Sequence, residues 1–231
     1  MKPKAINQAW NGTEKCQLCP IRDLVLFADL KQEDFNFFHF PIKELEFKAG
    51  ETIYKQNDTI NFVYTIRSGL VKLVHYLPNG NYRITRLLRQ GDLAGIEALN
   101  GADFLQQAIA MKNTSICRIP VQNIDQLNSH STHLYSQLTA RWQKVQSDAD
   151  IWLSQLTMGS SKHRVANLLL YLASNSHSEG SFFLPCREDI GALLAITTET
   201  ASRVIAEFNR TGFLESHKNS AKIHPSKLNL A

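Results

Sequence analysis

Three polar side chains near the C-terminal end of the sequence have a spacing suited to reading DNA bases. Glu199, Ser202 and Arg203 lie at positions i, i+3 and i+4, so they share one face if this stretch is helical. Arginine pairs bidentately with guanine, glutamate accepts from the N4 amine of cytosine, and serine contacts either kind of base edge. The chemistry available to these residues is therefore sequence-specific recognition in the major groove.

The surrounding run, residues 185–213, predicts the elements that must position them. We expect a first helix at 187–194, in which Gly191 lets a second helix approach closely. Thr197 is the expected N-cap of the second helix, because its hydroxyl can satisfy a free backbone N–H. The residues expected on the buried face of that helix are Val204, Ile205 and Phe208. Two short helices and a tight turn form the motif that lays a helix in the major groove.

The residues after the second helix predict a β-hairpin wing, with strands at 214–215 and 221–224. Contacts to phosphates position a protein on DNA without specifying a sequence. The side chains proposed to make such contacts are Thr198, Thr200, Lys218 and Lys222. Taken without its neighbours, the second helix could also be an ordinary surface helix. Glu199 and Arg203 would then form an ion pair that stabilises it by about 0.3–0.5 kcal/mol. Because helix, turn, cap and wing occur in order, we favour DNA binding.

The composition is that of a globular protein. The 231 residues are 43% hydrophobic and 20% charged, enough for two modest domains with packed cores. A net charge of +4 is by itself a weak argument for nucleic acid. Without an apolar run of membrane-spanning length or a signal-peptide core, we expect a cytoplasmic protein with no membrane partner. The four cysteines are then expected to be thiols or metal ligands rather than disulfides.

The rest of the chain divides into a β region and a helical region. Short β-branched and aromatic runs from 42 to 120, separated by glycines, predict a barrel or β-roll, with a type I′ hairpin turn at Asn79-Gly80. Helical periodicity begins at 121. Apolar residues spaced 4, 3, 4, 3 and 4 apart form a coiled-coil seam that predicts a homodimer interface: Leu138, Trp142, Val145, Ala149, Trp152 and Leu156. One amphipathic helix packed on its own β-domain is the alternative.

Nearly the whole chain resembles the CRP/FNR superfamily of bacterial transcription regulators. The runs GDLAGIEALNG, NTSICRIP and REDIGALLAITTETASRVIAEFNRTGFL occur in the family's order and spacing, with the long helix between the last two. The resemblance implies an α+β fold with a cyclic-nucleotide-binding-like β-roll and a winged helix-turn-helix. Its expected segments are a cysteine-containing arm at 1–28, a β-roll sensor at 29–125, a dimerisation helix at 126–157 and a DNA-binding domain at 158–231.

The E-x-x-S-R pattern of Glu199, Ser202 and Arg203 is similar to the FNR branch of this superfamily. That likeness implies a palindromic operator, TTGAT-N4-ATCAA, whose two half-sites suit a two-fold dimer. The implied partners are double-stranded DNA, a second copy of the chain and RNA polymerase. The implied mechanism is a two-state switch, in which a signal in the β-roll changes how two long helices pack.

The FNR likeness also implies an iron–sulfur cluster. Cys16 and Cys19 match the family's C-x2-C pair and Cys117 matches its distal ligand, but Val25 stands where a third cysteine is expected. A [4Fe–4S] cluster normally takes four thiolates. Three explanations remain open. Asp23 or a histidine such as His39 completes the site, or three thiolates leave one iron position open. Otherwise the cluster is lost, and the protein responds to another small effector or through a Cys16/Cys19 thiol switch.

Other signals and other classes of protein fit the sequence less well. Glu97 is shifted by one residue from the cyclic AMP pattern, and Gln106-Gln107 stand where a phosphate-binding arginine is needed. The candidate axial ligands for a haem are His39, His75, His130 and His133. We expect no enzyme, because the sequence lacks a Walker loop, a nucleophile elbow, an H-E-x-x-H motif and a thioredoxin-like context for its C-x2-C pair. A scaffold without DNA affinity would not need the Glu199/Ser202/Arg203 face.

Overall fold

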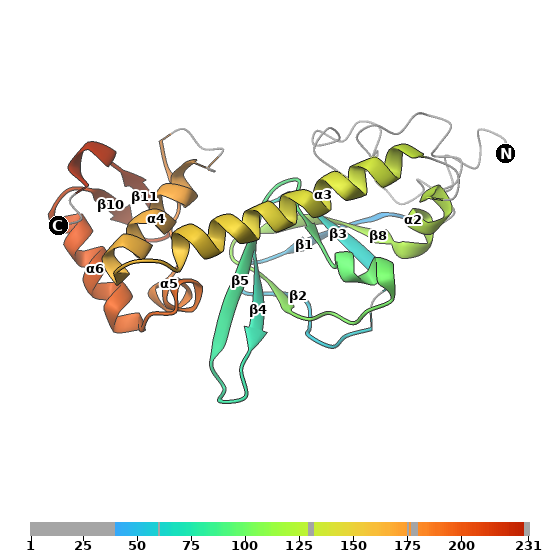
Figure 1. The fold of residues 1–231 in the computed structure, drawn as a ribbon, viewed down its shortest axis with the longest axis horizontal. Helices are drawn as coiled ribbons and strands as arrows, with labels where there is room; N and C mark the ends of the chain where they lie inside the picture. The colour runs from blue at the N-terminus through green and yellow to red at the C-terminus, as the bar shows by residue number, and fades with distance from the viewer. Residues whose placement is uncertain (1–39, 60, 129–131, 175, 177–179, 229–231) are drawn as a thin grey trace. The chain divides into compact units, whose positions relative to one another are not determined.

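A computed structural model describes residues 40–59, 61–128, 132–174, 176 and 180–228 (Figure 1). The chain divides into two compact units. Of the described residues, the first unit holds those up to 145 apart from 82–84, and the second holds 82–84 and those from 146 onward. The first unit is rich in strands and the second is rich in helices.

Two four-stranded sheets make up the described β region, in the orders β1-β8-β3-β6 and β2-β7-β4-β5. The strands are β1 (Lys43–Phe47), β2 (Thr52–Tyr54), β3 (Phe62–Ser68), β4 (Val71–Tyr76), β5 (Tyr82–Leu88), β6 (Leu93–Ala94), β7 (Gln107–Ala110) and β8 (Thr114–Pro120). Ile66 and Ile116 from one sheet and Leu73 and Ala108 from the other belong to one buried core. Burial of one face of each sheet holds the roll together, and the predicted α+β fold is confirmed.

The hairpin between β4 and β5 has a different turn from the one predicted. The Gly80 N–H donates to the Leu77 carbonyl at 3.0 Å, and the Leu77 N–H donates to the Asn81 carbonyl at 2.8 Å. Gly80 has a positive φ of 82°, whereas Asn79 does not have a positive φ. Pro78 explains the difference. It has no N–H, so it cannot form the closing pair with Asn81 that a two-residue Asn79-Gly80 turn requires, whereas its φ near −65° suits the first central position of a type I turn. The type I′ prediction was wrong: the loop has three residues and ends in a left-handed glycine.

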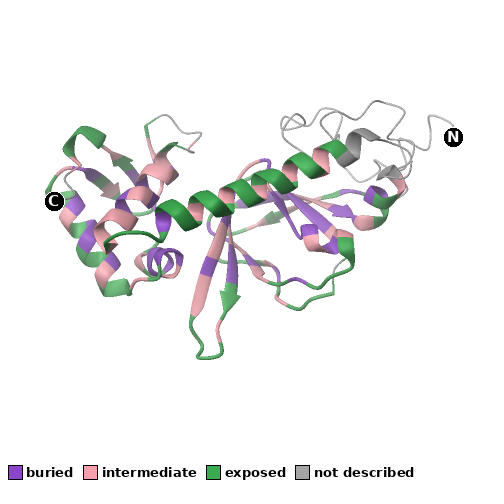
Figure 2. Ribbon diagram, in the orientation of Figure 1, coloured by how far each residue is buried: buried purple, intermediate pink, exposed green. Residues whose placement is uncertain are grey.

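The helical region begins with a short helix η4 (Ile96–Asn100) in the roll and continues after β8 as α2 (Val121–Asn128) and α3 (Thr132–Ile151). A π-helical turn, η5 (Trp152–Leu156), directly follows α3. The Lys144 ammonium of α3 pairs with the Asp92 carboxylate of the roll at 2.7 Å. Figure 2 shows exposed and half-buried residues along most of α3. Within the described ranges, no helix is both long and apolar enough to cross a membrane.

The second unit contains the predicted winged helix-turn-helix. Its elements are α4 (Ser161–Ser174), β9 (Phe182–Phe183), α5 (Arg187–Leu194), α6 (Thr198–Arg210), β10 (Leu214–His217), β11 (Ser220–Ile223) and a final turn η6 (Pro225–Lys227). The three strands form a sheet in the order β10-β11-β9. Side chains from α4, α5 and α6 are buried together, and the rings of Phe208 and Phe213 meet edge to face at 4.9 Å.

Gly191 allows the turn between α5 and α6 to close. A Cβ atom at this position would lie 2.7 Å from the Ile196 carbonyl oxygen, closer than side-chain carbons pack. The Gly191 carbonyl also accepts from the Ile196 N–H at 3.2 Å. Ala195, at the end of α5, takes the left-handed conformation with a φ of 54°. A side chain at 191 would therefore push the second helix away from the first.

We expect Gly191→Ala to lower the free energy of unfolding of the second unit by about 1–3 kcal/mol, because the added methyl group overpacks a closed turn. Urea denaturation followed by tryptophan fluorescence measures this loss, since Trp152 lies in the second unit. Ala206→Ser, which adds one atom at an exposed position of α6, is the control and should change stability by less than about 0.5 kcal/mol. Equal stability of Gly191→Ala and the wild type would contradict the close approach.

Candidate nucleic-acid interface

Helix α6 begins at a formed N-cap. Thr197 is extended, with φ −73° and ψ 158°, and its Oγ1 accepts from the Thr200 N–H at 3.1 Å. This bond satisfies one of the N–H groups that the start of a helix leaves unpaired. The inner face of α6 is buried through four residues: Ala201, Val204, Ile205 and Phe208. The predicted cap and the predicted buried face are both confirmed.

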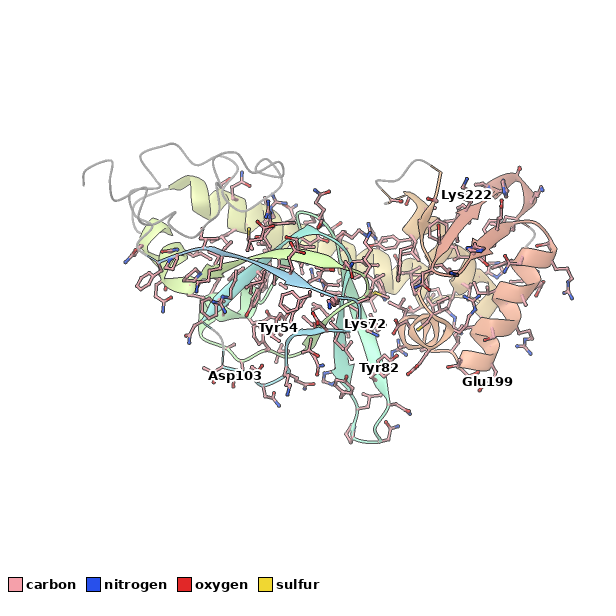
Figure 3. All side chains as sticks on the ribbon, turned by 180° about the vertical axis from the view of Figure 1, so that it is seen from behind. Tyr54, Lys72, Tyr82, Asp103, Glu199 and Lys222 are labelled. Carbon is pink, nitrogen blue, oxygen red and sulfur yellow. The ribbon has the colours of Figure 1, made fainter. Side chains whose placement is uncertain are left out.

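The outer face of α6 carries the three residues that the sequence singled out. Glu199, Ser202 and Arg203 are all exposed. Figure 3 shows Glu199 at the outer end of α6, pointing away from the unit. A helix inserted in the major groove contacts bases through its N-terminal residues. The arrangement therefore presents an acid, a hydroxyl and a guanidinium at the end of the helix that enters the groove.

The Glu199 carboxylate is stabilised in its charged form. Its own backbone N–H and, second, the Thr197 hydroxyl hold the pKa of Glu199 below its usual value. An ionised carboxylate has acceptors only. It can therefore accept from the N4 amine of cytosine but cannot donate to the O4 carbonyl of thymine.

The residues proposed to contact phosphates differ in their surroundings. Thr198 is exposed, whereas Thr200 is half-buried and its Oγ1 lies 3.2 Å from the Thr197 Oγ1. Lys218 is exposed in the wing turn, where its φ is 52°. Lys222 is exposed on β11, opposite Glu215 of β10, and Figure 3 shows it on the wing. Both lysines can therefore reach an anion outside the protein surface.

Two cations on α4 link it to α5 and α6, and the sequence did not reveal their role. The Arg164 Nη1 donates to the Leu194 carbonyl at the end of α5 at 2.7 Å. The Lys162 Nζ lies 3.0 Å from the Glu207 carboxylate of α6. The end of a helix leaves carbonyls unpaired, so a cation is well placed there. Both contacts join residues 30 or more positions apart, which local spacing cannot reveal.

Cys186 also has a structural role that the sequence did not suggest. It is the N-cap of α5, and its Sγ accepts from the Asp189 N–H at 3.4 Å. Serine, threonine, asparagine and aspartate are the usual residues at this position, so a cysteine gives little signal. The thiol therefore contributes to the start of the first helix of the motif.

Cys117 is the only proposed cluster ligand within the described part of the chain. The other three, Cys16, Cys19 and Asp23, lie outside the described residues. Cys117 is half-buried on β8, opposite Glu44 and Thr65. The Glu44 carboxylate pairs with Arg67 and accepts from the Ser115 hydroxyl at 2.7 Å. Across the described ranges, no three histidine, cysteine or acidic side chains form a metal-binding group. The described residues alone do not fit a cluster that takes four thiolates.

The interior of the roll is filled by aromatic rings. The ring centroids of Tyr54 and Phe104 are 3.7 Å apart, and those of Tyr54 and Tyr64 are 5.5 Å apart. Burial raises the pKa of Tyr54 far above its usual value, so its hydroxyl stays protonated. Gln107, in the region where a nucleotide phosphate would need an arginine, donates to the Thr52 hydroxyl of β2 at 3.1 Å. It brings no cation to this region.

The histidines proposed as haem ligands have no common site in the described residues. His39, His130 and the side chain of His133 lie outside them. His75 is exposed on β4, and its Nδ1 lies 3.5 Å from the Leu105 carbonyl oxygen. No haem pocket can be assembled from this one side chain.

The first residues of the proposed dimer seam follow one face of α3 as a stripe that is partly exposed. Trp142 is 53% exposed, Ala149 is exposed and Val145 is half-buried. Leu138 packs against the core of the roll. A groove of about 270 Å³ lies beside this stripe, between η4, α2 and α3. Its walls include Ile96, Leu99, Ile124, Leu138 and Trp142.

The last two residues of the proposed seam are used within the chain. Leu156 is only 1% exposed, and the Trp152 ring meets Tyr171 of α4 edge to face at 5.8 Å. The π turn explains the burial of Leu156, because it adds a residue and rotates the positions after its start relative to a regular α-helix. Leu153, which is 63% exposed, takes the outward position instead. The exposed stripe therefore continues from Ala149 to Leu153 rather than to Trp152.

Comparisons with known proteins identify both parts of the chain. Residues 44–131 match the cyclic nucleotide-binding domain family, and residues 163–227 match the Crp-like helix-turn-helix domain family. The transcriptional activator protein FnrA of Stutzerimonas stutzeri is 28% identical over 214 residues, which cover 90% of this chain and 88% of the relative. The fumarate and nitrate reduction regulatory protein of Escherichia coli strain K12 is 29% identical over 206 residues, covering 86% and 82%.

The fold is also similar to that of a solved structure. FixK2 from Bradyrhizobium japonicum aligns with a TM-score of 0.72 at 24% sequence identity, covering 79% of this chain and 92% of that one. At this identity the likeness bears on the fold alone. The two family matches occur in the order that the roll and the winged motif require, and the curated relatives are named as transcription regulators. The chain therefore belongs to the CRP/FNR superfamily and is a DNA-binding transcription regulator.

Proposed function

We propose that this protein is a homodimer that reads a palindromic operator through α6 of each copy, and that a signal sensed in its N-terminal domain controls this binding. The observation that carries the proposal is the exposed trio of Glu199, Ser202 and Arg203 on a helix whose opposite face is buried. Bound at a promoter in the cytoplasm, such a dimer would act on RNA polymerase.

The expected operator is TTGAT-N4-ATCAA, in which each half-site has one G·C pair. Arg203 would pair with the guanine and Glu199 with the N4 amine of its cytosine, while Ser202 would contact a neighbouring base. Thr198, Lys218 and Lys222 would contact phosphates and fix the register of the helix. Thr200 is the weaker phosphate candidate, because its hydroxyl lies close to that of Thr197.

We expect Arg203→Ala to weaken binding to this operator by about 1–3 kcal/mol, with little effect on scrambled DNA, because it removes a bidentate contact to guanine. Fluorescence anisotropy at several salt concentrations measures both affinities. Lys218→Ala is the matched control. It should weaken binding to both duplexes. It should also lower the slope of log affinity against log salt concentration by about one, because one fewer counterion is released. If Arg203→Ala binds the operator as tightly as the wild type, Arg203 does not read a base.

The proposed dimer interface follows the exposed stripe of α3. It contains Trp142, Val145 and Ala149 and continues to Leu153 after the π turn. Large apolar side chains exposed at helical spacing are typical of a surface that a partner helix covers. The groove beside Trp142 offers the second helix an apolar recess. Two α6 helices held in this way would match the two half-sites of a palindrome.

We expect Trp142→Glu to convert the dimer to a monomer at micromolar concentration, because a charge would have to be buried at the centre of the interface. Sedimentation velocity measures the change in mass. Gln143→Glu adds the same charge at the neighbouring exposed position, off the stripe, and should leave the dimer intact. If Trp142→Glu remains a dimer and Gln143→Glu dissociates, the interface lies on another face of α3 and the proposed one is wrong.

The proposed signal is redox state, oxygen or nitric oxide. The match to FNR-named relatives supports a cluster held by Cys16, Cys19 and Cys117, with Asp23 completing the site. One observation favours a second candidate. Cys186 is the N-cap of α5. Three other cysteines remain in the chain, whereas a [4Fe–4S] cluster normally has four thiolate ligands. The alternative is a regulator without a cluster that responds to another small effector or through a Cys16/Cys19 thiol switch.

Anaerobic purification followed by iron and sulfide assays and a visible spectrum separates these candidates. If a cluster is present, Cys117→Ser should lose most of the iron, because it removes a thiolate ligand. Cys186→Ser should retain the iron and fold normally, since serine is also a good N-cap. A colourless, iron-free wild type that still binds its operator would exclude the cluster and leave the second candidate.

A further inference from the structure

The wing has a lysine at a position where the backbone favours glycine. His217 of β10 pairs with Ser220 of β11, so the turn between these strands has two residues, Lys218 and Asn219. Lys218 has a φ of 52°, which lies in the left-handed region. Residues other than glycine adopt this conformation at a cost in backbone energy, and such residues are often found at functional sites. A strained and exposed lysine therefore indicates that its side chain has a use.

Two hydrogen bonds fix the side-chain amide of Asn209, which is the second-last residue of α6. Its Nδ2 donates to the Ile205 carbonyl, one turn earlier in the same helix, at 3.0 Å. Its Oδ1 accepts from the Ser216 hydroxyl of β10 at 3.1 Å. Because the amide nitrogen is used within α6, the oxygen is the atom that faces the wing. Asn209 therefore joins α6 to the first strand of the wing.

Ser216 is well placed to hold the wing from within the second unit. Side chains alternate between the two faces of a strand, so Ser216 shares a face with Leu214, which is only 2% exposed. Its partner across the hairpin, Ala221, is also 2% exposed. Ser216 itself is half-buried and lies two residues before Lys218. It is therefore the inward-facing side chain of β10 that is nearest to the wing turn.

We propose that Asn209 is a positioning residue for DNA binding, which holds the wing against the end of α6 through Ser216 so that Lys218 meets a phosphate while α6 lies in the major groove. The inference rests on the proposed phosphate contact of Lys218. A wing that is held in place before binding loses less conformational freedom when it meets DNA. Phosphate contacts carry no sequence information. The pair of Asn209 and Ser216 therefore contributes to affinity for any duplex rather than to base discrimination.

Substitutions at Ser216 and Asn209 test this role with little disturbance of the fold. Ser216→Ala removes the donor, Asn209→Ala removes the acceptor, and Ser216→Thr keeps the hydroxyl and suits a β-strand. The measurement is the dissociation constant of the full-length protein for TTGAT-N4-ATCAA and for a scrambled duplex, obtained by fluorescence anisotropy at one salt concentration. Ser216→Ala is also made in a Lys218→Ala background. Thermal unfolding followed by circular dichroism checks that all variants fold.

We expect Ser216→Ala to weaken binding to both duplexes about threefold, the effect of one exposed hydrogen bond, and Ser216→Thr to bind as the wild type does. Asn209→Ala should cause a similar loss, and combining it with Ser216→Ala should add nothing. The loss is small because the Asn219 carbonyl still accepts from the Leu184 N–H at 2.9 Å, which holds the other side of the wing turn.

The Lys218→Ala background separates positioning from a general effect on folding. In this background Ser216→Ala should cause no further loss of affinity, because no lysine is left to position. A defect of folding alone would weaken binding in both backgrounds, since it does not depend on the side chain at 218.

The outcomes distinguish the inference from the function on which it rests. If Lys218→Ala weakens binding but Ser216→Ala does not, the positioning role is overturned and the phosphate contact of Lys218 stands. An equal loss from Ser216→Ala in both backgrounds also overturns it, as does an equal loss from Ser216→Thr and Ser216→Ala, because the hydroxyl is then not the cause. If Lys218→Ala itself leaves both affinities unchanged, Lys218 contacts no phosphate and both proposals fail.

Discussion

The burial of one face of α6 is the interaction on which the rest of the DNA-binding unit depends. Ala201, Val204, Ile205 and Phe208 are each at most 4% exposed. Their burial fixes how the helix is rotated about its own axis, because a rotation would bring charged residues into the core. The polar face is directed outward as a consequence. Hydrophobic packing therefore decides which side chains can meet DNA before any DNA is present.

A small number of charged and polar contacts then set the position of the helix ends. With a net charge of only +4, the chain has little general attraction for a polyanion, so placement of individual groups matters more. Arg164 holds the end of α5, and Lys162 pairs with Glu207 on α6. Gly191 permits the turn between these helices to close. Arg164 and Gly191 act at the turn between α5 and α6, and Lys162 acts on the second half of α6, so together they favour one placement of the reading face.

Local patterns in the sequence were sufficient for the elements but not for the contacts between them. The bounds of α5, the Thr197 cap and the inner face of α6 follow from hydrophobic spacing and capping rules, which act within a few residues. Asn79-Gly80 alone predicts a type I′ turn, but the proline before it lacks the N–H that would close such a turn, so the hydrogen bonds close at Leu77 and Asn81 instead. The π turn at Trp152–Leu156 leaves the heptad spacing intact in the sequence, so only the structure reveals the change of face. The roles of Arg164 and Cys186 depend on tertiary contacts and an unusual cap residue, which no local spacing indicates.

The same groups that would form the dimer seam also belong to the packing of the roll. Leu138 contacts the core of the roll, and Trp142 forms one wall of the groove whose other walls come from η4 and α2. The pair between Lys144 and Asp92 ties the next turn of α3 to the loop before β6. Packed side chains transmit displacement because they leave little free volume. In the proposed dimer, a signal that shifts η4 or the loop at Asp92 would be expected to change the surface that Trp142 offers to a second copy, because Leu138 and Lys144 contact the roll on either side of Trp142. Under the proposed function, these contacts would couple the signal to the geometry of the dimer and to the spacing of its two α6 helices.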